Sequence, residues 1–151
     1  MSRRERYVVA DAAGDVLAQV CEAVFDVLDQ SAVTLRIDAY SDFNDQMPPD
    51  ITSAEAWLRS RGFTRGEGDP GRRIVFARTD ETGWAIARAY APWSIRTALF
   101  DADDVNVATL DDGGRSVVVD LTDEQASLLS LALGEVASLA PLPEPDDHER
   151  P

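Results

Sequence analysis

The stretch TALFDADDVNVATLDDGGRSVVVDLT, residues 97–122, decides the fold. Three short runs of apolar and β-branched residues are separated there by two polar segments, Asp101–Asp104 and Asp111–Gly114. Clusters of Asp and Gly between such runs commonly join neighbouring strands of an antiparallel sheet. The pattern therefore predicts strands over 94–100, 105–110 and 115–121, linked by two tight turns.

Three further runs extend the predicted sheet toward the N-terminus. Residues 32–40, AVTLRIDAY, alternate between apolar and polar side chains, as a half-buried strand does. Residues 72–79 and 83–91 also have the composition of strands, with a turn from Asp80 to Gly83 between them. The chain is therefore expected to form a largely antiparallel sheet of five to six strands, mostly a meander.

Helical patterns lie on both sides of these strands. Residues 12–30 place apolar side chains at three- and four-residue spacing. A short helix follows a capping box of Thr52 with Glu55, and a last, longer helix follows a second capping box of Thr122 with Gln125. The apolar stripe of this last helix comprises Leu128, Leu129, Ala132, Leu133, Val136 and Ala140. Two long amphipathic helices and one short helix, packed on an antiparallel sheet, define an α+β fold.

The length of the chain suits one domain. With 151 residues, 44% of them hydrophobic, the chain can bury a core without disulfides or metals. We expect a single α+β domain over residues 1–140. Residues 141–151, PLPEPDDHERP, have the proline-rich, acidic composition of a disordered tail.

The charge of the chain is strongly negative and unevenly distributed. The net charge is -14, and every one of the 14 basic residues is arginine. Residues 11–55 carry -9 and residues 101–151 carry -11, whereas residues 56–100 carry +4. Acidic flanks of this kind favour a basic protein partner and disfavour nucleic acid. The alternative is that the charge serves solubility or adaptation to salt.

Several classes of protein are disfavoured by the composition. No stretch approaches the roughly 18 apolar residues of a membrane span, and the apolar run Tyr7–Ala10 is too short for a signal peptide. We therefore expect a cytoplasmic protein that does not bind membranes. One cysteine, Cys21, excludes an internal disulfide and lies on an apolar stripe, and the lack of lysine excludes Schiff-base chemistry. We expect no cofactor and no metal.

One motif has the form of a catalytic site. The segment ALFDADDV, residues 98–105, resembles the Asp-x-Asp-x-Thr/Val motif of haloacid-dehalogenase-type phosphatases, which implies nucleophile and proton-transfer roles for Asp101 and Asp103. In that family a long α/β domain follows the motif, whereas here about 46 residues follow. The only histidine, His148, lies in the expected tail, so a Ser-His-Asp triad has no base. We interpret residues 101–105 as a turn and expect no enzymatic activity.

A partner-binding face is predicted in residues 83–96, GWAIARAYAPWSIR. A strand over 83–91 would place four alanines on one side and the larger side chains on the other. Aromatic residues and arginine are enriched at interface hot spots. The candidate residues of this face are Trp84, Arg88, Tyr90, Trp93 and Arg96. In the alternative interpretation, Trp84 and Tyr90 pack under a helix and Arg88 pairs with an acidic neighbour.

A second candidate surface is the acidic loop YSDFNDQMPPD, residues 40–50. Phe43 offers an apolar contact between the carboxylates of Asp42 and Asp45, a combination that suits docking on a basic protein. Met47 is a further apolar side chain of the same loop. The alternative is that Phe43 and Met47 anchor the loop to the core.

These features favour a protein that works by binding. In size, charge and mixture of elements the chain is similar to bacterial immunity proteins, antitoxins and secretion chaperones. We therefore expect a non-enzymatic protein that occludes a basic or enzymatic partner, such as a toxin or effector. The alternatives are an escort protein of the secretion-chaperone type, a homodimer formed through the sheet, and a small-molecule site using an arginine and aromatic pocket.

Overall fold

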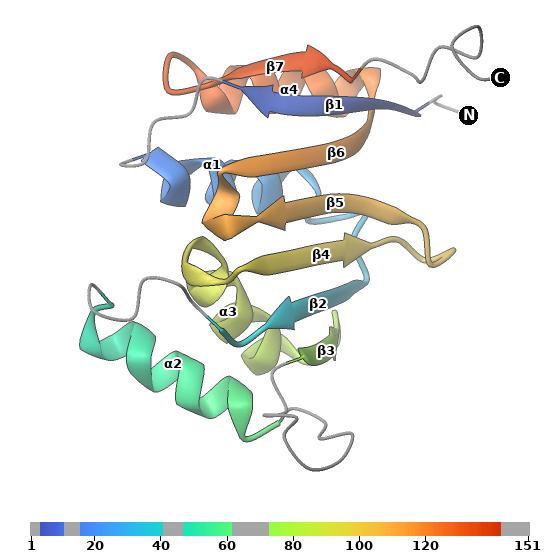
Figure 1. The fold of residues 1–151 in the computed structure, drawn as a ribbon. Helices are drawn as coiled ribbons and strands as arrows, with labels where there is room; N and C mark the ends of the chain where they lie inside the picture. Colours follow the sequence, from blue (N-terminus) through green and yellow to red (C-terminus); the bar gives the residue numbers. More distant parts are fainter. Residues whose placement is uncertain (1–3, 11–15, 41–46, 62–72, 143–151) are drawn as a thin grey trace, which may run out of the picture.

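The computed structural model describes residues 4–10, 16–40, 47–61 and 73–142, which form one sheet with helices packed on it (Figure 1). The strands are β1 (Arg4–Ala10), β2 (Thr34–Asp38), β3 (Arg73–Ala77), β4 (Arg96–Phe100), β5 (Asn106–Asp111), β6 (Ser116–Thr122) and β7 (Ser138–Pro141). The helices are α1 (Leu17–Val27), α2 (Pro49–Arg59), α3 (Glu81–Tyr90) and α4 (Asp123–Leu133). The described residues thus confirm the α+β class and the antiparallel sheet.

The predicted meander is confirmed at the centre of the sheet. The strand order is β3-β2-β4-β5-β6-β1-β7, and every pair of neighbours is antiparallel. Across the meander, Leu99 of β4 pairs with Ala108 of β5, which pairs with Val119 of β6. The strand expected over 32–40 is present as β2, and the one expected over 72–79 as β3.

The prediction of a strand over 83–91 was wrong, because these residues form helix α3. Alternation between alanine and larger side chains also satisfies a helical period, since Trp84, Ala87 and Ala91 recur at three- and four-residue spacing and are buried together. Alanine is the strongest helix former. The expected turn at Asp80–Gly83 is the start of this helix, where the Asp80 carboxylate accepts a hydrogen bond from the Gly83 amide at 3.0 Å.

The sheet of the described residues has seven strands, not five to six. β1 lies inside the sheet, between β6 and β7. It was missed in the sequence because its pairing partners are more than a hundred residues away. β7 was missed because residues 138–140 were assigned to the last helix and Pro141 to the tail. That helix ends at Leu133, where Gly134 takes a positive φ of 55°.

The helices also differ from the prediction of two long and one short. The described residues hold four, each of ten or eleven residues. The capping box of Thr122 with Gln125 is confirmed at the start of α4. The one expected at Thr52 is wrong, because α2 begins at Pro49 and the Thr52 hydroxyl donates to the Pro48 carbonyl oxygen at 3.2 Å inside the helix.

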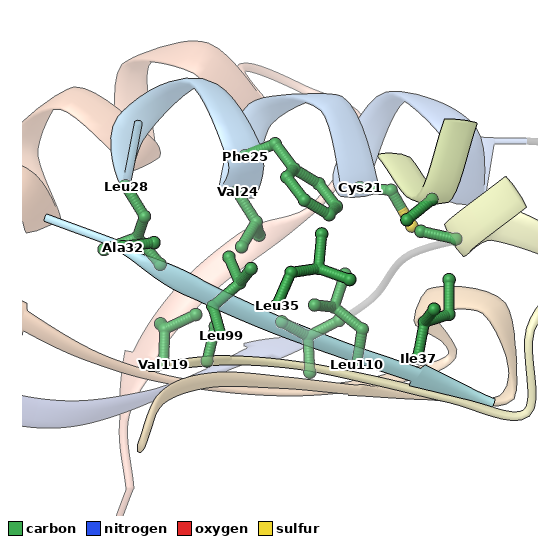
Figure 2. Packing of buried hydrophobic residues seen from close by; sticks show 14 of the residues in the cluster. Cys21, Val24, Phe25, Leu28, Ala32, Leu35, Ile37, Leu99, Leu110 and Val119 are labelled. Atoms are coloured by element: carbon green, nitrogen blue, oxygen red, sulfur yellow. The ribbon is translucent and has the colours of Figure 1, made fainter. Parts of the chain in front are cut away.

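The core lies between the sheet and helix α1. Figure 2 shows Val24, Phe25 and Leu28 of α1 pointing onto the sheet, above leucines of β2, β4 and β5. Those leucines, Leu35 and Leu99 among them, are at most 1% exposed. Burying such side chains contributes about 2 kcal/mol each. No helix in the described parts of the chain is long and apolar enough to cross a membrane.

Helices α1, α3 and α4 lie behind the sheet in Figure 1, all on one face, and α2 lies beside its β3 end. The opposite face carries no helix among the described residues, and we call it the uncovered face. Of the expected tail, Pro141 belongs to β7, and residues 143–151 lie outside the described residues.

Candidate functional site

The face predicted from residues 83–96 is not assembled, since two of its aromatic residues belong to the core. Trp84 is 6% exposed and lies under the guanidinium of Arg78, 5.0 Å from its ring centroid. Tyr90 is fully buried, and its hydroxyl donates to the Glu55 carboxylate of α2. Burial and this carboxylate together raise the pKa of Tyr90. Both residues are buried, as in the alternative interpretation, but they belong to helix α3 itself and not to a strand beneath a helix.

Arg88 lies on α3 and reaches across to α1. Its Nη2 donates to the Glu22 and Asp26 carboxylates, each at 2.5 Å, while its guanidinium lies 5.4 Å from the ring centroid of Phe25. The acidic neighbour considered in the alternative interpretation is therefore a pair of carboxylates on α1. Arg88 joins two helices and is separated from Arg96.

Trp93 and Arg96 lie apart from the other three predicted residues. Trp93 is partly buried against the core. Arg96 lies on the uncovered face, because its neighbour Thr97 points into the core, and its Nε donates to Asp111 at 2.8 Å. A single pocket lined by Trp84, Arg88, Tyr90 and Arg96 is therefore ruled out by their positions.

The residues of the acidic loop cannot be compared with the structure. Asp42, Phe43 and Asp45 fall in 41–46, which lie outside the described residues. Met47 is described, and it is partly buried against the core. This position fits the alternative for Met47, in which this side chain packs on the core.

The phosphatase-like motif lies in the connection between β4 and β5. The Asp101 carboxylate accepts hydrogen bonds from the amides of Asp103 and Val105, both at 2.9 Å, and from Arg4 at 2.8 Å. The bond from the Val105 amide makes the largest contribution to lowering the pKa of Asp101. The carboxylate in the nucleophile position of the motif thus closes the turn.

The uncovered face of the sheet is polar and largely neutralised by its own side chains. Arg73 of β3 pairs with Asp38 of β2 at 3.5 Å, and Arg96 pairs with Asp111, each pair lying opposite across neighbouring strands. Arg36 lies 5.2 Å from the ring centroid of Phe100. Cross-strand ion pairs of this kind are usual on a solvated sheet face. An open hollow on this side is lined by Asp38, Tyr40, Ile95, Arg96, Asp111 and Asp112.

The helical side carries an apolar surface that the sequence analysis did not identify. On α4, Leu131 is 80% exposed and Leu128 is 50% exposed, whereas Leu129 and Leu133 are buried. Leu128 lies one turn before the exposed Ala132 on the same face of the helix. Exposed large apolar side chains next to each other mark interaction sites more often than solitary ones.

A groove lies between α1 and α4, and we call it the α1–α4 groove; Ala132, which lines it, follows Leu128 by one turn of α4. The groove has a volume of about 410 Å³ and is open to solvent. It is lined by Ala18, Gln19, Glu22, Ala23, Asp26 and Ala132. Alanines form its apolar lining, and the carboxylates of Glu22 and Asp26 form its edge on α1, with side chains 64% and 67% exposed.

The α1–α4 groove has features for binding another molecule but no reactive thiol. Cys21 of α1 is buried, with its Sγ 3.6 Å from the Gly113 carbonyl oxygen, and burial raises the pKa of its thiol to about 12, so it does not supply a nucleophile near neutral pH. Among the residues that the structure describes, no three or more His, Cys, Asp or Glu side chains are grouped to hold a metal ion. Apolar contact and negative charge are what the α1–α4 groove presents.

One signal in the sequence could have revealed this surface. The stripe assigned to the last helix leaves out Leu131, which has no place on the face that holds Leu129 and Leu133. A large apolar residue outside the buried stripe of a short helix is a candidate contact residue.

No family model matches the chain, and no curated protein or solved structure matches it either. A functional proposal therefore rests on the surfaces described above.

Proposed function

We propose that this chain is a non-enzymatic protein that binds and occludes another protein, as immunity proteins and antitoxins do, with the α1–α4 groove as its docking site. The observation that carries the proposal is the exposure of Leu131 and Leu128 on α4, the helix that contributes Ala132 to the groove. In the free protein these two side chains are exposed to water. Burying each of them against a docked partner would contribute about 2 kcal/mol to binding.

The charge of the groove favours a basic partner. Glu22 and Asp26 lie at its edge; Asp123 and Glu124 at the start of α4, and Glu135 just after its end, are exposed carboxylates as well. Within a chain of net charge -14, this surface would accelerate encounter with a positively charged protein. Occlusion then needs no chemistry of its own, since a bound acidic domain blocks the partner's active surface.

Two alternatives predict different behaviour. An escort protein of the secretion-chaperone type would use the same groove but release its partner in active form. A small-molecule site at the Arg96 hollow would have to displace Asp111 from Arg96 before a carboxylate or phosphate could bind. Docking on α4 requires no such displacement, because Leu128 and Leu131 are already exposed.

The test combines capture with a functional readout. Tagged wild-type protein and the double variant Leu128→Ser/Leu131→Ser are used to capture partners from the native host, and the captured partner is then purified and assayed with and without the protein. We expect a stoichiometric partner that is inhibited by the wild type and not retained by the double variant.

Val75→Ser is the matched control. Val75 is 53% exposed on β3, on the uncovered face, so the substitution removes a similar exposed apolar side chain far from the groove. It should leave capture and inhibition unchanged. A partner that the double variant retains, or one that binds without being inhibited, contradicts the proposal; the second result supports the escort alternative.

A further inference from the structure

We propose that the α1–α4 groove accepts a basic amphipathic helix of the partner, which lies along α1 and α4 as a third helix. This inference rests on the proposed function and names the occupant of the same site. It follows from three properties of the groove: its small lining residues, its lack of free backbone groups, and the placement of its charges.

The small residues allow close approach. Ala23 of α1 and Ala132 of α4 line the groove, as does Ala18, near the start of α1. Alanine side chains leave room for the side chains of an approaching helix to interdigitate. On α4, Leu128 lies one turn before Ala132, and Leu128 and Leu131 are exposed apolar side chains that a docked helix would cover.

The backbone of the groove favours a helix over an extended segment. A strand gains affinity mainly by pairing its main-chain groups with a sheet edge. The groove lies between the side chains of two helices, whose amides and carbonyls are bonded internally. An extended segment would lose its hydration there without gaining backbone hydrogen bonds, whereas a helix satisfies its own.

The charges favour basic side chains on that helix. Glu22 and Asp26 share one guanidinium, that of Arg88, which approaches from α3. The second oxygen of each carboxylate has no hydrogen bond to the residues that the structure describes. A partner arginine or lysine can therefore bind the same two carboxylates from the groove side without displacing Arg88.

A second copy of this chain is a poorer occupant. Two copies docked through α4 would bring Glu124 and Glu135 of each toward the same residues of the other, and each copy carries a net charge of -14. Like charges brought together at an interface oppose association.

The experiment uses synthetic peptides of about 18 residues, long enough for a stable isolated helix. The first contains Leu, Ala and Arg, with leucines at three- and four-residue spacing; the second has the same composition with the leucines dispersed around the helix. A third replaces the arginines of the first with glutamine. Binding of each labelled peptide to the full-length protein is measured by fluorescence anisotropy at low and moderate salt.

We expect the first peptide to bind at least about tenfold more tightly than the second or the third, with affinity falling as salt rises. In the protein, Glu22→Gln/Asp26→Asn should weaken the first peptide about tenfold at low salt. Asp103→Asn/Asp104→Asn makes the same change in net charge in the exposed β4–β5 turn and should change affinity less than about threefold. Circular dichroism checks that each variant is folded.

The glutamine peptide keeps the charge test independent of any effect of the variants on folding. Equal binding of the striped and dispersed peptides, or tight binding of the glutamine peptide, overturns the inference. Dimerisation of the wild type that Leu131→Ser abolishes also overturns it, in favour of a second copy. If the peptides do not bind while partner capture still requires Leu131, the basic helix is wrong and the proposed function stands.

Discussion

At the scale of single residues, Thr97 of β4 is buried without a hydrogen-bond partner among the described residues. Valine has nearly the same shape and removes the unsatisfied hydroxyl. We expect Thr97→Val to raise the free energy of unfolding by about 1 kcal/mol, measured by urea denaturation. Thr109→Val is the control, because the Thr109 hydroxyl donates to Asn106 at 3.0 Å and its loss should not stabilise the protein. Destabilisation by Thr97→Val would show that the hydroxyl is satisfied after all.

Cys21 makes stability depend on pH in the alkaline range. Its pKa is raised by burial from 9.0 to about 12, so the folded state disfavours the thiolate. The stabilising contribution is complete below pH 9 and decreases by about 1.4 kcal/mol per pH unit as the pH rises from 9 toward 12.

The measurement is urea denaturation of wild type and Cys21→Ala between pH 8 and 10.5. The wild type should lose stability more steeply above pH 9. Tyr90, whose pKa is also raised, contributes equally to both proteins, so the difference isolates Cys21. The folded thiol should also resist labelling at pH 8. Parallel pH profiles, or rapid labelling of the folded protein, would contradict a buried thiol.

At the scale of elements, α2 is held to the rest of the molecule by a few contacts. Leu58 is fully buried, Trp57 stacks on Phe76 with ring centroids 6.0 Å apart, and Glu55 accepts the hydrogen bond from Tyr90. Tyr90→Phe removes that bond and leaves Glu55 with its ion pair to Arg59, at 3.4 Å, within the same helix. We expect a loss of about 1–2 kcal/mol of stability and faster hydrogen exchange in α2 than in α1.

Tyr7→Phe provides the comparison for this element. Tyr7 is partly buried on β1, and no hydrogen bond joins its hydroxyl to the described residues. The same substitution there should change stability by less than about 0.5 kcal/mol. If Tyr90→Phe and Tyr7→Phe behave alike, the Glu55 contact does not hold α2.

At the scale of the whole molecule, the charge distribution opposes folding. A net charge of -14 on 151 residues produces self-repulsion in the compact state. The ion pairs on the uncovered face, including Arg96 with Asp111, act in the other direction but lie at the surface and are individually weak.

Salt should therefore stabilise the protein. Raising NaCl from about 20 mM to about 500 mM shortens the screening length below the spacing of most charges. We expect Tm, measured by circular dichroism, to rise by a few degrees. Potassium chloride should act like sodium chloride, because the effect is one of ionic strength. A fall in Tm with salt would show that the surface ion pairs outweigh the net repulsion.

The sequence by itself determined the α+β class, the strands on either side of Asp101 and Asp111, and the helix start at Thr122. Each depends on local chemistry: a run of β-branched residues, an Asp-Gly turn, or a side chain that caps its own helix. The turn at Asp101 was identified correctly for the same reason, since the two amides that donate to the Asp101 carboxylate lie at most four residues away in the sequence.

Only the tertiary structure decided which residues are exposed and which strands complete the sheet. Residues 83–91 suit both a strand and a helix, and packing on the core selects α3. β1 lies inside the sheet through pairs such as Val8 with Val118, which no local pattern encodes. Leu131 and Leu129 are the same residue type on one helix, yet one is exposed and the other buried, because burial depends on the position of α1 and the sheet around α4. The candidate site is a property of that arrangement.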